Sequence, residues 1–148
     1  MKLDFSGLPQ VQAWSAGDED FSLSGFVMAN VTVAEAAVLS ALFWPDFVEF
    51  QGCVFLDFKF EEKGVNSWLD RLKSDLRAVE AVVNQVHLWD MFAPTSPEEY
   101  KVLSQLAGRV SDIWRAAVRH AFPDREFLVS VADDPEEYGP TLTLTQVN

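Results

Sequence analysis

The sequence predicts an α+β domain with a mainly antiparallel sheet of about five to six strands, packed by one long helix in the C-terminal half and two to three shorter helices. Expected strands occur in hairpin pairs near residues 47–60 and 126–147, and helical patterns cluster between them. One helical pattern, which opens at Ser96, is much longer than the others. The chain has 148 residues, the size of one domain, so we expect residues 1–148 to share a single core.

The N-terminal third is expected to hold a loop, a strand and a short helix. Ser15–Asp20 is polar and acidic and is expected to be a loop, whereas Phe21–Met28 begins with the alternation of apolar and polar residues typical of a strand. Thr32 and Glu35 match a capping box, in which each side chain bonds the other residue's backbone amide. A helix should follow and end before Pro45, because helical backbone is disfavoured before proline.

Two strands, Phe47–Gln51 and Cys53–Phe60, are expected around a turn at Gln51 and Gly52. The second strand alternates, so its two faces should differ. One face would carry Val54, Leu56, Phe58 and Phe60, and the other would carry Cys53, Phe55, Asp57 and Lys59. The charged residues of the second face indicate that it points toward solvent.

A helix is expected from about Asp75 to Val86, because apolar residues recur there at helical spacing. Its apolar stripe would consist of Leu76, Val79, Val83 and Val86. The following segment, His87–Phe92, is compatible with either a strand or a turn.

The strongest local signal is the sequence Ser96, Pro97, Glu98, Glu99, which joins an N-cap serine, a proline at the first helical position and a capping glutamate. It predicts a helix that runs to about Ala121 and is ended by Pro123. Its apolar stripe would consist of Leu103, Leu106, Ala107, Val110, Ile113, Trp114, Ala117, Val118 and Ala121. Such a stripe predicts a helix that lies across one face of the sheet.

The C-terminal segment predicts a hairpin. Glu126–Val131 and Thr141–Val147 have the composition of strands, and an acidic loop from Asp133 to Tyr138 joins them, followed by Gly139 and Pro140.

The net charge of −12 excludes some classes of partner. An acidic surface repels nucleic-acid phosphate and anionic membranes, so we expect neither as a binding partner. The single cysteine, Cys53, cannot form an internal disulfide, which fits a reducing cytoplasm. The first residues lack the basic and apolar pattern of a signal peptide, and no run approaches the ~20 apolar residues of a membrane helix.

No known catalytic or metal-binding motif occurs in the sequence, so we expect no cofactor, no metal and no enzymatic activity. The alternative is a small enzyme or an apolar-ligand-binding domain with a pocket between the sheet and the long helix. Such a pocket would use His87, Asp90, Asp57 and Cys53.

The segment 43–62 combines seven aromatic residues with five acidic residues and one lysine. Aromatic surface beside negative charge suits a cationic protein partner, which such a field also attracts from a distance. We therefore expect a non-enzymatic module that binds a basic protein, for example an immunity or inhibitor protein that neutralises a basic toxin or nuclease. The predicted contact residues are Trp44, Asp46, Glu49, Phe55, Asp57, Asp133, Asp134, Glu136 and Glu137. A further alternative is a homodimer that buries the aromatic hairpin against its own copy.

Overall fold

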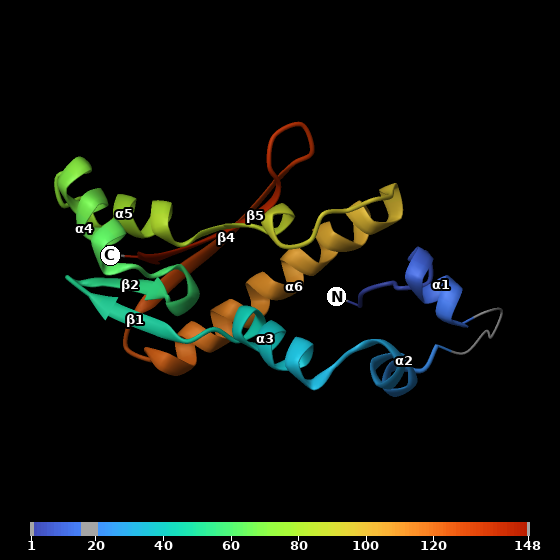
Figure 1. Ribbon diagram of the computed structural model, residues 1–148. Coiled ribbons are helices and arrows are strands. Elements are labelled where there is room, and N and C mark those ends of the chain that lie inside the picture. The colour runs from blue at the N-terminus through green and yellow to red at the C-terminus, as the bar shows by residue number, and fades with distance from the viewer. Residues whose placement is uncertain (1, 16–20, 148) are drawn as a thin grey trace.

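The strands of the described chain form two antiparallel sheets, and the predicted α+β class is confirmed. The computed structural model describes residues 2–15 and 21–147 (Figure 1). The strands are β1 (Phe47–Phe50), β2 (Cys53–Leu56), β3 (Gln85–His87), β4 (Glu126–Asp134) and β5 (Gly139–Val147). β1 pairs with β2, and the larger sheet has the order β3-β5-β4. One sheet of about five to six strands was expected, whereas the five strands of the described residues are divided between two sheets.

The described residues also form six α-helices, so the prediction of two to three shorter helices beside the long one was too low. They are α1 (Pro9–Ser15), α2 (Leu23–Asn30), α3 (Val33–Phe43), α4 (Glu62–Arg71), α5 (Leu76–Val83) and α6 (Pro97–Ala121). Two short 3-10 turns, η1 (Asp57–Lys59) and η2 (Leu88–Asp90), complete the chain. The predicted loop at residues 15–20 lies outside the described residues, except that Ser15 ends α1.

The N-terminal elements are more helical than the sequence pattern indicated. The strand predicted at residues 21–28 is wrong, because this segment contributes to α2. Ser22 is the N-cap, and its Oγ accepts a hydrogen bond from the Gly25 amide at 3.1 Å. The prediction for α3 is confirmed: Thr32 and Glu35 form the capping box, and the helix ends at Phe43.

β2 is shorter than predicted, because η1 follows Leu56 and ends the alternation of its side chains. All four residues of β2 are fully buried, so its second face does not point toward solvent. Leu56 packs into the main core, whereas Phe55 packs into a second cluster under α4 and α5. The second cluster also includes Phe60, whose ring lies 5.7 Å from that of Phe55. The strand thus separates two small cores.

The long helix α6 carries the main core, as its stripe predicts. Ser96 Oγ accepts from the Glu99 amide at 3.1 Å, which confirms the predicted N-cap. The buried residues of α6 are Leu103, Ala107, Val110, Ser111, Trp114, Ala117 and Val118. They face Val129, Leu142 and Leu144 of the larger sheet. The Trp114 indole also donates to the Leu42 carbonyl at 2.8 Å, which fixes the end of α3 to α6.

The terminal hairpin is confirmed, but its strands are longer than predicted. The β4–β5 ladder extends to the pairs of Asp133 with Pro140 and Asp134 with Gly139. Two of the acidic residues assigned to the loop are therefore strand residues. Gly139 has a φ of +63°, and a side chain there would meet the Trp89 indole, so this position requires glycine.

Two buried polar side chains of α5 join the two sheets, and we refer to Glu80 and Asn84 as the polar clamp. The Asn84 side chain accepts from the Leu56 amide at 2.9 Å and donates to the carbonyls of Val54 and Leu144 at 2.9 and 3.1 Å. The Glu80 carboxylate accepts from the Val54 amide at 2.8 Å and from the backbone amide and the side chain of Gln146. The clamp thus supplies hydrogen-bond partners to backbone groups of β2 and β5 that a strand between them would otherwise supply.

The predicted helix to Val86 ends at residue 83 because of this clamp. Asn84 is the C-cap of α5, and its side chain turns into the core, after which β3 begins at Gln85. Val86, the last member of the predicted stripe, is instead buried in the main core as a strand residue. The chain at His87–Phe92 therefore starts as the end of β3 and continues as a 3-10 turn.

Replacement of the clamp asparagine should destabilise the fold strongly. Asn84→Ala leaves three buried backbone groups without their partners, and we expect a loss of about 2–4 kcal/mol in the free energy of unfolding. Urea denaturation followed by circular dichroism measures this loss. Asn66→Ala, at an exposed position of α4, is the matched control and should change the value by less than about 0.5 kcal/mol. Equal effects of the two substitutions would contradict the assigned role.

Candidate functional site

The predicted acidic surface is divided between two ends of the molecule. At one end, Asp46 and Asp57 are both exposed. They are adjacent, because the Asp57 amide donates to the Asp46 carbonyl at 2.9 Å. Glu49, also exposed, forms an ion pair with Arg125 at 3.2 Å, immediately before β4 begins. The ion pair places Glu49 at the start of the terminal hairpin, whereas Asp46 and Asp57 lie at the open end of the β1–β2 pair.

The remaining acidic residues lie at the opposite end of β4. Asp133 and Asp134 close that strand, and Glu136 and Glu137 lie in the following turn, all of them exposed. β4 is nine residues long, and a strand rises about 3.3 Å per residue, so about 26 Å separates its two ends. The two groups therefore form separate acidic patches. Some of these carboxylates also have partners within the chain: Asp133 accepts from the Tyr100 hydroxyl, and Asp134 accepts from the Glu136 amide.

The two predicted aromatic anchors differ in exposure. The Trp44 side chain is half exposed, and its ring lies 6.1 Å from that of His120. Phe55 is fully buried, so its prediction as a surface anchor is wrong. The predicted alternation placed this ring on the same face as Asp57. α4 and α5 cover that face at Phe55 but leave Asp57 exposed.

The alternative catalytic pocket does not form. Cys53 is buried in the second cluster, where its Sγ lies 3.7 Å from the Leu76 carbonyl, whereas Asp57 and Asp90 are exposed on separate 3-10 turns. His87 lies near the tip of the terminal hairpin, with Nδ1 at 2.9 Å from the Thr141 hydroxyl. The cavity beside His87 has a volume of about 150 Å³ and includes none of the other three residues. Across residues 2–15 and 21–147, no three metal-ligating side chains are grouped to hold an ion.

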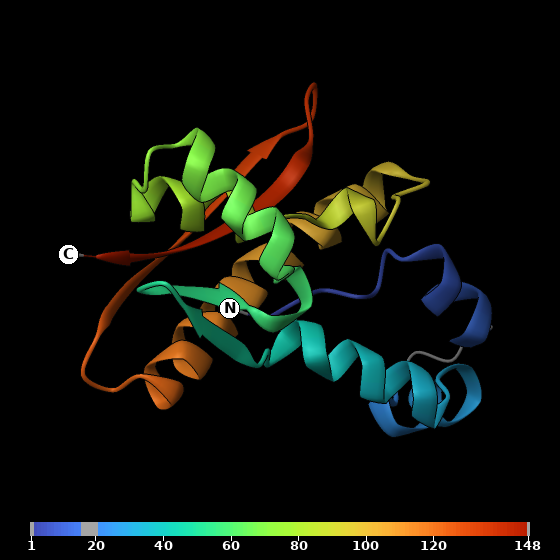
Figure 2. The same cartoon turned by 60° about the vertical axis from the view of Figure 1, so that its left-hand side comes forward.

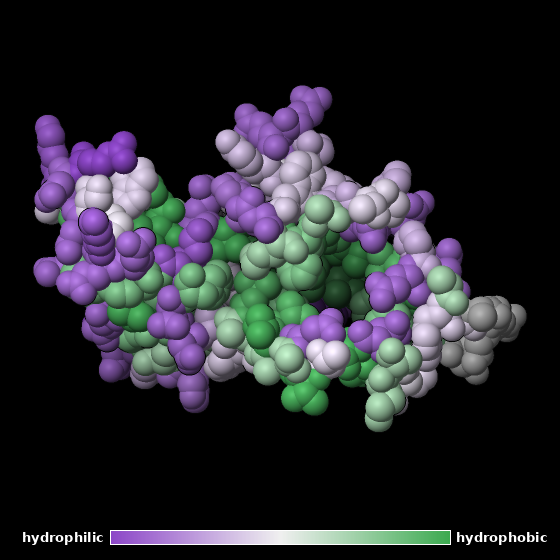
Figure 3. Space-filling view, in the orientation of Figure 1, coloured by the Kyte–Doolittle hydropathy of each residue, from purple (hydrophilic) through white to green (hydrophobic). Residues whose placement is uncertain are grey.

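An apolar groove that the sequence analysis did not predict lies between the N-terminal helices and the first half of α6. It consists of two cavities of about 370 and 270 Å³ that share Leu8 and Glu99 on their borders. Phe5, Val11, Phe21, Leu23, Phe26 and Val27 contribute to the larger cavity. Phe92, Pro94, Val102, Leu103 and Leu106 contribute to the smaller one. Figure 3 shows a hollow lined by hydrophobic residues in this part of the molecule.

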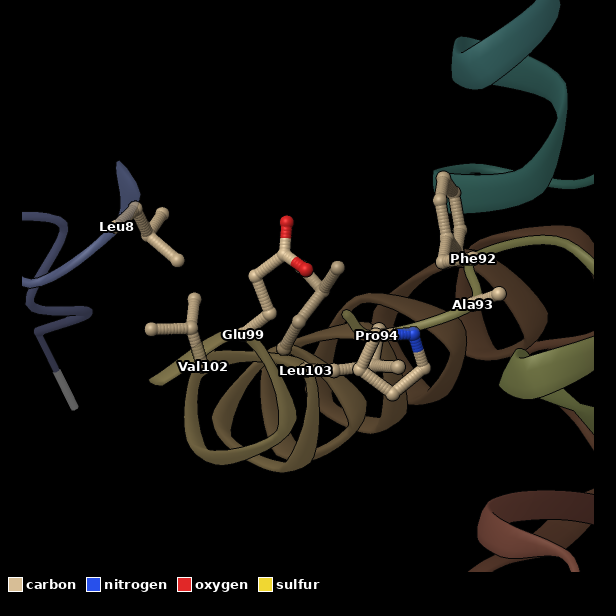
Figure 4. A pocket seen from close by; sticks show the side chains of 8 residues that line it. Leu8, Phe92, Ala93, Pro94, Glu99, Val102 and Leu103 are labelled. Carbon is tan, nitrogen blue, oxygen red and sulfur yellow. The ribbon is translucent and has the colours of Figure 1, made fainter. Parts of the chain in front are cut away.

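Glu99 places a negative charge inside this groove. Among the described residues that line the two cavities, it alone is charged. Its carboxylate points into the space between Leu8 and Phe92 (Figure 4). The Thr95 amide and hydroxyl both donate to Oε2 at 2.6 Å, and these bonds lower the pKa of Glu99. The carboxylate is therefore ionised at neutral pH.

Helices α2 and α3, which we call the apolar arm, continue the hydrophobic surface beyond the groove. In both views the arm extends away from the two sheets (Figures 1 and 2). Met28, Val33 and Val38 are 86%, 88% and 73% exposed, values that are unusual for large apolar side chains. Residues 21–43 contain one charged residue, Glu35, and this low charge was the sequence signal that could have revealed the arm.

The comparisons with known proteins gave no assignment: no protein-family model, no curated protein and no solved structure matches this chain. No single helix of the described chain is long and apolar enough to cross a membrane. α2 and α3 together meet that criterion of length and composition, but they are bent by 116° relative to each other.

The Cys53 thiol should not react with alkylating reagents in the folded protein. Burial, together with the nearby Glu80 carboxylate, raises the pKa of Cys53 to about 11, from 9.0 for an unperturbed thiol. At pH 8 the reactive thiolate is then a fraction of about one in a thousand, and the chain covers it. We expect stoichiometric labelling by iodoacetamide only in 8 M urea, with mass spectrometry as the readout. Rapid labelling of the native chain at pH 8 would contradict this assignment and reopen a role for Cys53 in chemistry.

Proposed function

We propose that this protein is a non-enzymatic module that binds a basic protein partner through the apolar arm and the adjacent groove. The observation that supports this most directly is the exposure of the arm. Proteins that act as monomers rarely expose contiguous apolar surfaces of this kind, and such surfaces are typical of interaction sites. The arm presents Met28, Val33 and Val38 to solvent, with a single charged residue along 23 positions.

The total accessible surface supports the same proposal. It is 9478 Å², whereas a compact monomer of 16.6 kDa exposes about 7,600 Å². The difference, roughly 1,900 Å², exceeds the area of about 800 Å² that each partner contributes to an interface of standard size. A partner that covers the arm would bring the exposed area toward the value expected for a compact protein.

The charge distribution indicates the sign of the partner. The net charge is −12, and residues 1–62 alone contribute ten acidic residues against two basic ones. An oppositely charged partner associates faster, particularly at low ionic strength. In this proposal the exposed acids at both ends of β4 attract the partner from a distance, and the apolar arm provides the contact. A basic toxin or nuclease that the module neutralises would be one partner of this class.

Loss of the apolar arm surface should abolish partner capture. The variant Met28→Ser/Val33→Ser/Val38→Ser changes only exposed side chains, so it should unfold at nearly the same urea concentration as the native chain. Immobilised on beads and exposed to a lysate of its source organism, the native chain should retain a basic protein that the variant loses. Quantitative mass spectrometry measures the retained amounts.

The matched control is Val131→Ser, which removes an exposed apolar side chain from β4 at a distance from the arm. It should retain the partner fully. The association rate should also fall as salt is raised from 50 to 500 mM, because the attraction is screened. Equal retention by all three proteins, or a retained partner that is acidic, would contradict the proposed function.

A further inference from the structure

We propose that the groove binds one amphipathic α-helix of the partner, and that a lysine or arginine of this helix pairs with Glu99. This inference rests on the proposed function and specifies the part of the partner that is recognised. It follows from three properties of the groove: its walls, the one charge among its described lining residues, and the division of its volume into two cavities.

The walls of the groove are built mostly from helices and offer no strand edge. α1, α2 and the first half of α6 contribute most of the lining residues. An extended peptide could not add to a sheet here, because β4 and β5 lie elsewhere in the fold (Figure 1). Apolar grooves between helices receive amphipathic helices, whose apolar side chains recur along one face. A helix is therefore the occupant that matches these walls.

The charge of Glu99 decides what that helix must carry. A purely apolar occupant would remove water from an ionised carboxylate and add no charge or donor to the two hydrogen bonds from Thr95, which is unfavourable. A lysine or arginine provides both the opposite charge and hydrogen-bond donors, and its aliphatic part fits an apolar surface. The groove thus favours a hydrophobic helix face that is interrupted by one cation.

The division of the groove defines the spacing of the recognised side chains. Both cavities border on Glu99, with the larger toward Phe26 and the smaller toward Phe92. Two apolar anchors would fill the two cavities, and the cation would lie between them on the same face. On a helix this order corresponds to apolar residues at positions i and i+7, with lysine or arginine at i+3 or i+4.

A second copy of the chain does not satisfy these requirements. Two chains of charge −12 repel each other. The exposed helices that a second copy could insert, α2 and α3, contain no lysine or arginine, so they offer no cation to Glu99. A helix of a basic partner can supply the lysine or arginine for Glu99 that α2 and α3 lack.

A displayed library of helical peptides tests the proposal without knowledge of the partner. The library keeps leucine at i and i+7 and randomises the positions between them, and it is selected against the native chain, Glu99→Gln and Glu136→Gln. Glu99→Gln retains an oxygen that can accept from Thr95 but removes the charge, and Glu136→Gln removes one charge from the distant hairpin turn. Unchanged urea midpoints confirm that both variants fold.

We expect lysine or arginine to be enriched at i+3 or i+4 with the native chain and with Glu136→Gln, and the enrichment to disappear with Glu99→Gln. The best peptide, measured by fluorescence anisotropy, should bind Glu99→Gln about three- to tenfold more weakly and Glu136→Gln almost as tightly as the native chain. Binding should increase amide protection in α1, α2 and the first half of α6.

Several results would overturn this inference: no selected binders, the same enrichment with all three proteins, or equal weakening by the two glutamine substitutions. A homodimer in light scattering that Val27→Ser converts to a monomer would also overturn it, because the occupant would then be a second copy. If these results occur while the arm variant still loses its captured partner, the proposed function stands and only the helix in the groove is wrong. If the native chain captures no partner, the proposed function fails independently.

Discussion

The arrangement of the two sheets depends on the polar clamp of Glu80 and Asn84. β2 and β5 face each other without sharing a ladder hydrogen bond, so their backbone groups would be buried without partners. Two side chains one helical turn apart on α5 supply those partners on both strands. A purely apolar α5 could fill the same volume, but it would leave amides and carbonyls unsatisfied. The clamp thus hydrogen-bonds one strand of each sheet to the same helical segment.

The apolar arm stands in contrast to the two sheets. Where the sheets satisfy their polar groups internally, α2 and α3 leave Met28, Val33 and Val38 exposed. The bond between Trp114 and the Leu42 carbonyl fixes the end of α3, and the Phe26 ring of α2 packs against that of Trp14. Because folding stability comes mainly from burial, such a segment contributes little to the stability of the isolated chain. Its hydrophobic composition is therefore better explained by contacts outside the chain than by a role in the core.

The sequence allowed the caps and hairpins to be predicted, because their signals are local. Thr32 and Ser96 act through neighbours within a few residues, and the terminal strands are joined by a short turn; each of them was identified correctly. The burial of Phe55 was not predictable, since it depends on two helices that return over β2 from later in the chain. The same holds for Asn84, whose role requires a strand 60 residues away. The α2 helix was missed because two apolar residues at alternating positions fit a strand as well as a capped helix.

The length of α6 has a consequence for how the groove responds to an occupant. This helix of 25 residues extends about 37 Å, and its first half takes part in both the main core and the floor of the groove, because Leu103 belongs to both. The floor is thus tied to the main core, whereas the opposite wall belongs to the N-terminal helices, which lie outside that core. We therefore expect the wall formed by α1 and α2 to adjust to an occupant more than the floor formed by α6 does. Selectivity for the size of the occupant's side chains would accordingly be lower along α1 and α2 than along α6.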